Sequence, residues 1–132
     1  MASLTVHHIG YLVKKIDKAK EAFTVLGYQI EQDTLRDEIR KVDICFLLKD
    51  GYRVELVSPY AADSVVSGLM KRYKNSPYHI CYETADFEAA FADLTAHGFI
   101  AIDAPTPAPA FQNRDVVFLS SAALGMIELI RP

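Results

Sequence analysis

The sequence predicts an α+β fold in which one βαβββ module occurs twice in tandem. The first observation behind this prediction is a repeated strand, since His8-Ile9-Gly10-Tyr11 returns in similar form as His79-Ile80-Cys81-Tyr82. The second is that Val54-Glu55-Leu56 returns as Ile127-Glu128-Leu129. A sequence that repeats in this way is built from one supersecondary unit used more than once.

The first module begins with alternating β-branched and aromatic residues at 6–13, which predict a strand. A helix is expected from Asp17 to Gly27, because glycine commonly follows the last helical residue. The apolar stripe of this helix, which should be buried, consists of Ile16, Ala19, Phe23 and Leu26. Residues 28–30 are predicted as a strand that leads into a charged and mobile stretch at 31–41.

The first module ends in a hairpin. Residues 42–48 and 52–57 read as strands, and Asp50-Gly51 between them is typical of a two-residue hairpin turn. The connector that follows is rich in turn residues, with a short helical run around residues 65–72.

The second module repeats the order of the first. Its elements are expected at residues 78–84 (strand), 86–97 (helix), 99–102, 114–119 and 125–130 (strands). Residues 105–112 contain three prolines and no helical period, so they are predicted as a loop. We therefore expect a single domain over residues 1–132, made of two modules at about 1–60 and 76–132, which a connector at about 61–75 joins.

One helix per module implies that the helices cover the outer face of the sheet and leave a concave cavity on the other face. Alternation along the strands predicts which residues face each side. The first-strand residues expected on the helix side are Ile9, Tyr11, Ile80 and Tyr82. Each module would then direct one histidine and one glutamate to the opposite side: His8 with Glu55, and His79 with Glu128.

These four residues favour a metal site. A lone histidine on a strand is usually a structural residue and a lone glutamate usually points to solvent, but four at matched positions of a repeat are harder to explain in that way. Two imidazoles and two carboxylates suit Zn, Co, Ni, Mn or Fe(II) and are poor ligands for Cu(I) or calcium. We expect one divalent metal ion, with two octahedral positions left for the oxygens of a substrate.

The same residues resemble the vicinal oxygen chelate superfamily, and within it the branch of methylmalonyl-CoA epimerase and glyoxalase I (lactoylglutathione lyase). The resemblance spans nearly the whole chain, and its motifs are Val54-Glu55-Leu56-Val57-Ser58-Pro59, the His79 strand, and Phe118-Leu119 followed by Gly125-Met126-Ile127-Glu128-Leu129. It implies a fold like that of glyoxalase and the bleomycin-resistance proteins, with His8, Glu55, His79 and Glu128 as the metal ligands. A glutamate at position 55, where such epimerases can have glutamine, is more typical of the glyoxalase end.

The resemblance also implies a function: a metal-dependent isomerase or lyase that removes a proton next to a carbonyl and stabilises the enolate on the metal. Glu128 and Asp43 are the two candidates for the base. Asp43 is predicted to alternate away from the core and resembles the base position of the epimerases, although an exposed aspartate at a strand end explains it equally well. Gln112, Asn113 and Arg114 border the proline-rich loop and are predicted to contact substrate.

Two other functions remain open on this scaffold. One is a metal-independent protein that binds and sequesters small molecules, as the bleomycin-resistance type does, which would not need the four ligands. The other is a ring-cleaving dioxygenase with two histidines and one carboxylate, for which Glu55 is a ligand too many. No basic cluster convincing for a CoA phosphate is visible, and the run Lys71-Arg72-Tyr73-Lys74 is expected to be a solvated helix end. The substrate, whether hemithioacetal, acyl-CoA or another small molecule, stays open.

The net charge and the cysteines of the chain narrow its possible partners and cellular compartment. A net charge of −3 and a pI near 5.7 argue against nucleic acid or an anionic membrane as partner. Cys45 and Cys81 fall in apolar strands and are expected to be buried thiols of a reducing compartment. We expect a cytoplasmic homodimer that acts on a small molecule, and the sequence leaves open whether its site forms within one chain or across the dimer.

Overall fold

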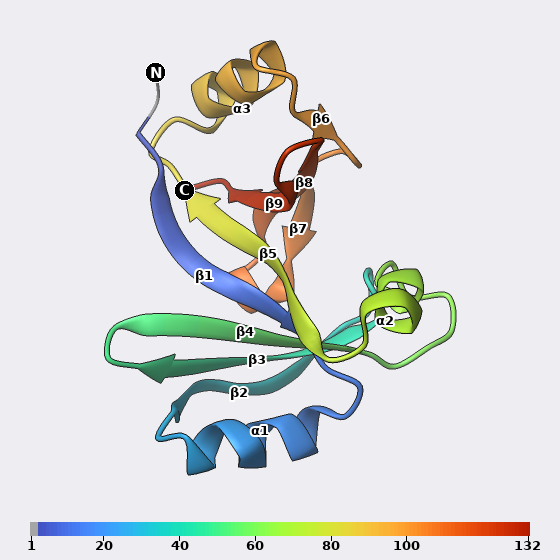
Figure 1. Cartoon of the computed structure of the whole chain (residues 1–132). Coiled ribbons are helices and arrows are strands. Elements are labelled where there is room, and N and C mark those ends of the chain that lie inside the picture. Colours follow the sequence, from blue (N-terminus) through green and yellow to red (C-terminus); the bar gives the residue numbers. More distant parts are fainter. Residues whose placement is uncertain (1–2) are drawn as a thin grey trace. The chain divides into compact units, whose positions relative to one another are not determined.

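The computed structural model, which describes residues 3–132, contains nine strands and three α-helices in a mixed α+β arrangement (Figure 1). The chain forms two compact units. Unit 1 consists of the residues up to 8 together with 79–132, and unit 2 consists of residues 9–78. Strands β1 (Thr5–Leu12) and β5 (Ser76–Glu83) contribute residues to both units. None of the helices in the described residues is long and apolar enough to cross a membrane.

Unit 2 contains the first module. After β1 come α1 (Ile16–Val25), β2 (Gln29–Asp37), β3 (Val42–Lys49), β4 (Tyr52–Pro59) and α2 (Ser67–Tyr73). Strands β2, β3 and β4 are neighbours in antiparallel pairs, and β4 pairs in parallel with the end of β1. The turn between β3 and β4 has positive φ at both central residues, Asp50 (φ 53°) and Gly51 (φ 81°), as the Asp-Gly sequence predicts.

Unit 1 repeats this arrangement with small changes. After β5 come α3 (Phe87–Ala96), β6 (Ile100–Ala101), β7 (Thr106–Ala108), a 3-10 turn (Pro109–Phe111), β8 (Arg114–Ser121) and β9 (Gly125–Ile130). Strand β9 pairs in parallel with β5 and antiparallel with β8, while β6 and β7 both pair with β8. The predicted βαβββ order is confirmed in the first module, and the second module has the same order with one additional short strand, β7, between β6 and β8.

In each unit the helix covers one face of the strands and the glutamate lies on the other. In unit 2 the cross-strand pairs Cys45–Leu56 and Leu47–Val54 belong to the core against which α1 packs, whereas Phe46 pairs with Glu55 on the opposite face. The pairs of unit 1 follow the same rule. Val117–Leu129 and Leu119–Ile127 pack with α3, and Phe118 pairs with Glu128 on the other face.

Two details predicted for the first helix are wrong. Helix α1 begins at Ile16 rather than at Asp17, which lies in its first turn. Leu26 follows the last helical residue, leaves the apolar stripe and is 63% exposed. Ile9 and Ile80 pair with the core residues Val54 and Ile127 and so lie on the predicted helix side, although each is 39% exposed. The reason for their exposure is length, because a helix of ten residues is about 15 Å long and cannot cover a strand of eight residues, which is about 26 Å long.

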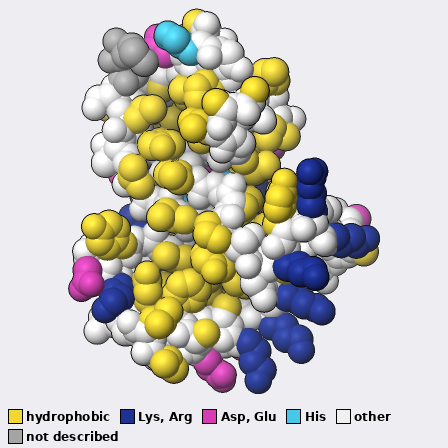
Figure 2. All heavy atoms as spheres, viewed as in Figure 1, with side chains coloured by type: hydrophobic (Ala, Val, Ile, Leu, Met, Phe, Trp, Pro, Cys, Tyr) yellow, Lys and Arg dark blue, Asp and Glu magenta, His cyan; other side chains and the backbone are white. Residues whose placement is uncertain are grey.

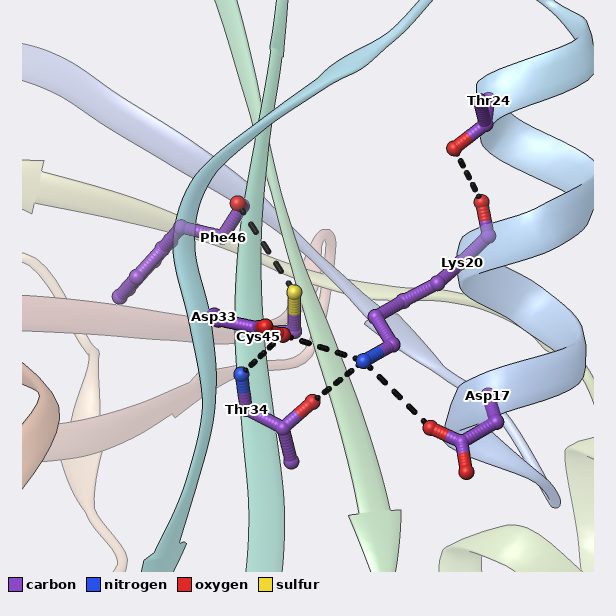
Figure 3. A network of polar contacts seen from close by, with 7 residues as sticks. All are labelled: Asp17, Lys20, Thr24, Asp33, Thr34, Cys45 and Phe46. Carbon is purple, nitrogen blue, oxygen red and sulfur yellow. Dashed lines mark hydrogen bonds and ion pairs between the residues drawn. The ribbon is translucent and has the colours of Figure 1, made fainter.

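The stretch predicted to be charged and mobile is mostly strand, because β2 continues to Asp37. Lys20 of α1 holds it in place: its Nζ lies 3.1 Å from Asp33 Oδ1 and donates to Thr34 Oγ1, and it lies 3.4 Å from Asp17 on its own helix (Figure 3). The hydrogen bond to Asp33 raises the pKa of Lys20 above its usual value. Beneath this network, burial raises the pKa of the Cys45 thiol, and both cysteines are buried and free as predicted.

The loop predicted at residues 105–112 is also structured. It contains strand β7 and a 3-10 turn that buries Phe111. Pro107 cannot donate a backbone hydrogen bond, and proline is tolerated here because β7 pairs only with β8 among the described residues and so lies at an edge.

A matched pair of leucines tests this assignment of the core. Leu119 is fully buried against α3, and Leu124 in the β8–β9 turn is 70% exposed. We expect Leu119→Ala to lower the free energy of unfolding by about 2–5 kcal/mol and Leu124→Ala by less than about 0.5 kcal/mol, as measured by urea denaturation. Equal losses for the two variants would contradict the packing described.

Candidate metal centre

Three ionisable side chains meet inside unit 1: His8 of β1, His79 of β5 and Glu128 of β9. All three are at least 96% buried. The parallel pairing of β5 with β9 places Cys81 opposite Glu128, and His79 lies two residues before Cys81 on the same face of its strand. The strand register therefore brings these side chains close together.

The three atoms that could bind a metal ion are nearly the same distance from one another. Glu128 Oε1 lies 3.2 Å from His8 Nε2 and 3.1 Å from His79 Nε2, and the two Nε2 atoms are 3.1 Å apart. Ligand atoms about 2.1 Å from one metal ion are about 3.0 Å apart at octahedral angles and about 3.4 Å apart at tetrahedral angles. The spacing therefore fits three neighbouring positions of an octahedral site.

The state of the Glu128 carboxylate supports the same interpretation. Burial by itself would raise the pKa of Glu128, but the close contacts with His79 and His8 outweigh it and hold the pKa well below the usual range. Glu128 Oε1 is buried and has no hydrogen bond of acceptable geometry to either imidazole. A buried, charged oxygen of this kind is costly unless a cation compensates it, so the residues present fit a divalent metal ion.

Glu55 occupies the matching place in unit 2. It is 3% exposed and lies opposite Phe46, as Glu128 lies opposite Phe118 in unit 1. Glutamate is rarely buried to this degree unless it is paired or binds a metal. Its predicted role as the fourth ligand stays a prediction.

Two residues that sequence reasoning missed surround His8. His7 Nδ1 lies 2.8 Å from His8 Nδ1, and the Phe111 ring stacks on the His8 ring at 5.6 Å with an interplanar angle of 12°. Phe111 also contacts the edge of His7 at 5.3 Å. The repeat does not reveal His7, because the matching position in the second module is Tyr78. Phe111 lies in a stretch that the sequence predicts as a loop.

His7 also belongs to a second group of possible ligands. His7, His8 and Cys81 each offer a ligand atom, and these atoms lie within 4.8 Å of one another. This set contains a sulfur and would prefer a softer metal than the two histidines and glutamate do. Because both groups use His8, the identity of the ligands distinguishes them experimentally.

Asp43 lies on the face of β3 opposite to that predicted. It pairs across the sheet with Ser58 and shares its face with Cys45 and Leu47, so it does not alternate away from the core. Its two carboxylate oxygens accept hydrogen bonds from Arg36, at 2.9 Å from Nε and 3.2 Å from the terminal nitrogen. The sequence suggested the wrong face because Asp43 is polar in an otherwise apolar strand.

The three predicted substrate contacts follow Phe111 directly. Gln112 and Asn113 are exposed and form a turn in which both have positive φ, 58° and 63°. Arg114 is half-buried and its Nε donates to the Phe111 carbonyl at 3.2 Å. The turn thus directly follows Phe111, whose ring stacks on that of His8.

Comparison with known proteins identifies the family. The sequence profile of the glyoxalase/bleomycin resistance protein/dioxygenase superfamily matches residues 7–118. The chain belongs to this superfamily. The resemblance predicted from the paired histidine and glutamate strands is thereby confirmed.

Curated relatives and solved structures refine the comparison. Mitochondrial methylmalonyl-CoA epimerases of mouse and human are each 28% identical to the chain over 91 residues, which are 67% of this chain and 51% of those proteins. The chain thus spans about half the length of the curated relatives it matches.

Three solved structures share the fold. A hypothetical protein of Bacillus halodurans C-125 has a TM-score of 0.85 and 21% identity, covering 98% of this chain and 95% of that one. Methylmalonyl-CoA epimerase of Mycobacterium tuberculosis has a TM-score of 0.82 and 20% identity, covering 96% and 87%. A variant of the Streptomyces coelicolor epimerase in complex with 2-nitronate-propionyl-CoA has a TM-score of 0.82 and 24% identity, covering 98% of both.

The contact between His7 and His8 leads to a prediction about metal affinity. A proton on His8 Nδ1 that is shared with His7 leaves His8 Nε2 free as a ligand, and such outer partners typically contribute 10–100-fold to affinity. We expect His7→Ala to weaken Zn²⁺ or Ni²⁺ binding by about that factor in isothermal titration. The control is His97→Ala, which removes an exposed histidine whose Nδ1 lies 2.7 Å from the Asp93 carbonyl oxygen. An affinity equal to that of the wild type in the His7 variant would contradict the orienting role.

Proposed function

We propose that the chain is a metal-dependent isomerase of the methylmalonyl-CoA epimerase type, which removes and returns a proton at a carbon next to a carbonyl group. The convergence of His8, His79 and Glu128 within 3.2 Å carries this proposal. The curated relatives support it at the level of reaction class, since they are methylmalonyl-CoA epimerases.

In this proposal His8, His79 and Glu128 hold a divalent metal ion, and Glu55 provides the fourth ligand. Support for Glu55 comes from its place in the repeat and from its burial. The bound ion would act as a Lewis acid on the substrate carbonyl and make the neighbouring C–H more acidic. Zn, Co, Ni, Mn and Fe(II) all suit two imidazoles and two carboxylates.

The aromatic residues have a separate task in unit 1. Phe111 stacks on His8, and Phe118 contacts the edge of the His79 ring at 5.1 Å. These contacts fix the orientation of both imidazoles and reduce access of water to them, which strengthens electrostatic interactions at the site. Gln112, Asn113 and Arg114 follow Phe111 and are proposed to contact the part of the substrate away from its reacting carbon.

A carboxylate takes up the proton and returns it. Glu128 is the first candidate, although it is a weak base for as long as both imidazoles contact it, since those contacts lower its pKa. Asp43 is the second candidate, and for this role it would have to leave Arg36. We favour Glu128, because Asp43 lies on the face of β3 opposite to Phe46 and Glu55.

Two other functions have less support. A lyase of the glyoxalase I type uses the same ligands, and Glu55 is the observation that favours it. A protein that only sequesters small molecules would gain nothing from three ionisable groups buried against one another, because burial of this kind lowers stability unless something compensates it.

Exchange of a carbon-bound proton tests the proposal. In D₂O, the metal-loaded protein should replace the α-proton of methylmalonyl-CoA by deuterium, as followed by proton NMR, and treatment with EDTA should abolish the exchange. Glu128→Gln should slow it at least about 100-fold, whereas Glu21→Gln, which alters an exposed carboxylate on α1, should leave it unchanged.

The comparison of variants assigns the base. If Asp43→Asn abolishes exchange while Glu128→Gln retains both metal and exchange, Asp43 is the base instead of Glu128. Exchange only with the hemithioacetal of methylglyoxal and glutathione would favour the lyase. Absence of exchange with both substrates, after loading with each of the five metals, would contradict the enzyme proposal.

A further inference from the structure

A lysine-lined groove on unit 2 is not used by the proposed reaction. It consists of two adjoining hollows with cavity volumes of about 380 and 690 Å³, both of which Lys14 and Asn75 line. Lys15 and Lys18 line the first hollow, and Lys71 and Lys74 line the second. Figure 2 shows several lysine and arginine side chains gathered at the lower right of the view, with others at the lower left.

The groove joins two segments that are distant in the sequence. The Lys14 backbone N–H donates to Asn75 Oδ1 at 2.8 Å, which ties the start of α1 to the residues after α2. Taken alone, the run around Lys71 is a solvated helix end, as the sequence predicts. The fold adds three lysines from the other segment and thereby creates a basic cluster that the sequence did not reveal.

The five lysines lack acidic partners. Within residues 3–132 none of them forms an ion pair with a carboxylate, and no acidic residue lines either hollow. Elsewhere in unit 2 the lysines are compensated: Lys20 contacts Asp17 and Asp33, and Lys41 contacts Asp63. Like charges that lie close together repel one another, so an anion with several charges would relieve a local cost.

The walls between the lysines are apolar. Tyr11, Phe23 and Ala19 line the first hollow, and Met70 and Pro59 contribute to the second. The volumes lie in the range of small-molecule sites, which combine apolar walls with a few charged groups. Ammonium groups recognise phosphate as a charge, and aromatic side chains pack against flat rings.

We propose that this groove binds a small molecule that carries two or more phosphate groups next to an aromatic ring, as a nucleoside diphosphate does. The phosphates would contact the lysines around Lys14, and the ring would pack in the hollow of Tyr11 and Phe23. The site is formed by residues of unit 2 alone and needs no metal ion, so it can be tested independently of the proposed reaction.

Calorimetric titration of the full chain in EDTA tests the groove, with ADP, pyrophosphate and adenosine as probes. We expect ADP to bind more tightly than either of its parts and more weakly as salt is raised. The double variant Lys14→Ala, Lys71→Ala should raise the Kd for ADP at least about tenfold. The control Lys41→Ala, Lys49→Ala removes the same charge from lysines outside the groove, which contact Asp63 and Asp50, and should change the Kd less than about twofold.

Several results would overturn the proposal. Absence of ADP binding would remove the site, and equal Kd values for pyrophosphate and ADP would remove the ring from it. An unchanged Kd in the Lys14, Lys71 variant would place the binding elsewhere. Binding of anionic vesicles or single-stranded RNA without binding of ADP would show that the lysines serve a macromolecule or a membrane surface instead.

Discussion

The contact among His8, His79 and Glu128 determines how the rest of the candidate metal centre is arranged. Three ionisable side chains lie within 3.2 Å of one another at nearly complete burial. A charged carboxylate in that position is expensive unless cations compensate it, and a divalent ion provides such compensation together with a chemical use. The aromatic rings of Phe111 and Phe118 and the neighbouring His7 then hold the imidazoles in place.

The fold makes this arrangement possible through the two faces of its strands. In each unit the helix takes the apolar face, so that pairs such as Cys45–Leu56 and Val117–Leu129 form the cores. The opposite face is also buried, as Ile44, Phe46 and Val57 of unit 2 show, and the acidic residues lie among these apolar side chains. Glu55 and Glu128 lie on this second face, each opposite a phenylalanine. A duplicated module therefore presents two related sets of the residues proposed as metal ligands.

The sequence revealed the parts of this structure that depend on alternation and repetition. The two modules apart from β7, the Asp50-Gly51 hairpin and the side of the strands on which His8 and His79 lie were predictable, because period-two patterns recur in the two halves. The extension of β2 to Asp37 was not predictable, since its polar residues resemble a loop and only Lys20 and the pairing with β3 show otherwise. In the same way, the three prolines at residues 105–112 made β7 and Phe111 resemble a loop. The side of Asp43 and the lysine groove depend on strand register and on distant segments, which local patterns do not contain.

X-ray absorption spectroscopy of the protein loaded with one equivalent of Zn²⁺ or Co²⁺ would identify the atoms bound to the metal. We expect two imidazole nitrogens with the remaining ligands oxygen, all at about 2.0–2.2 Å, and no sulfur. A sulfur at about 2.3 Å would show that Cys81, with His7 and His8, holds the metal instead. That result would contradict the site of His8, His79 and Glu128.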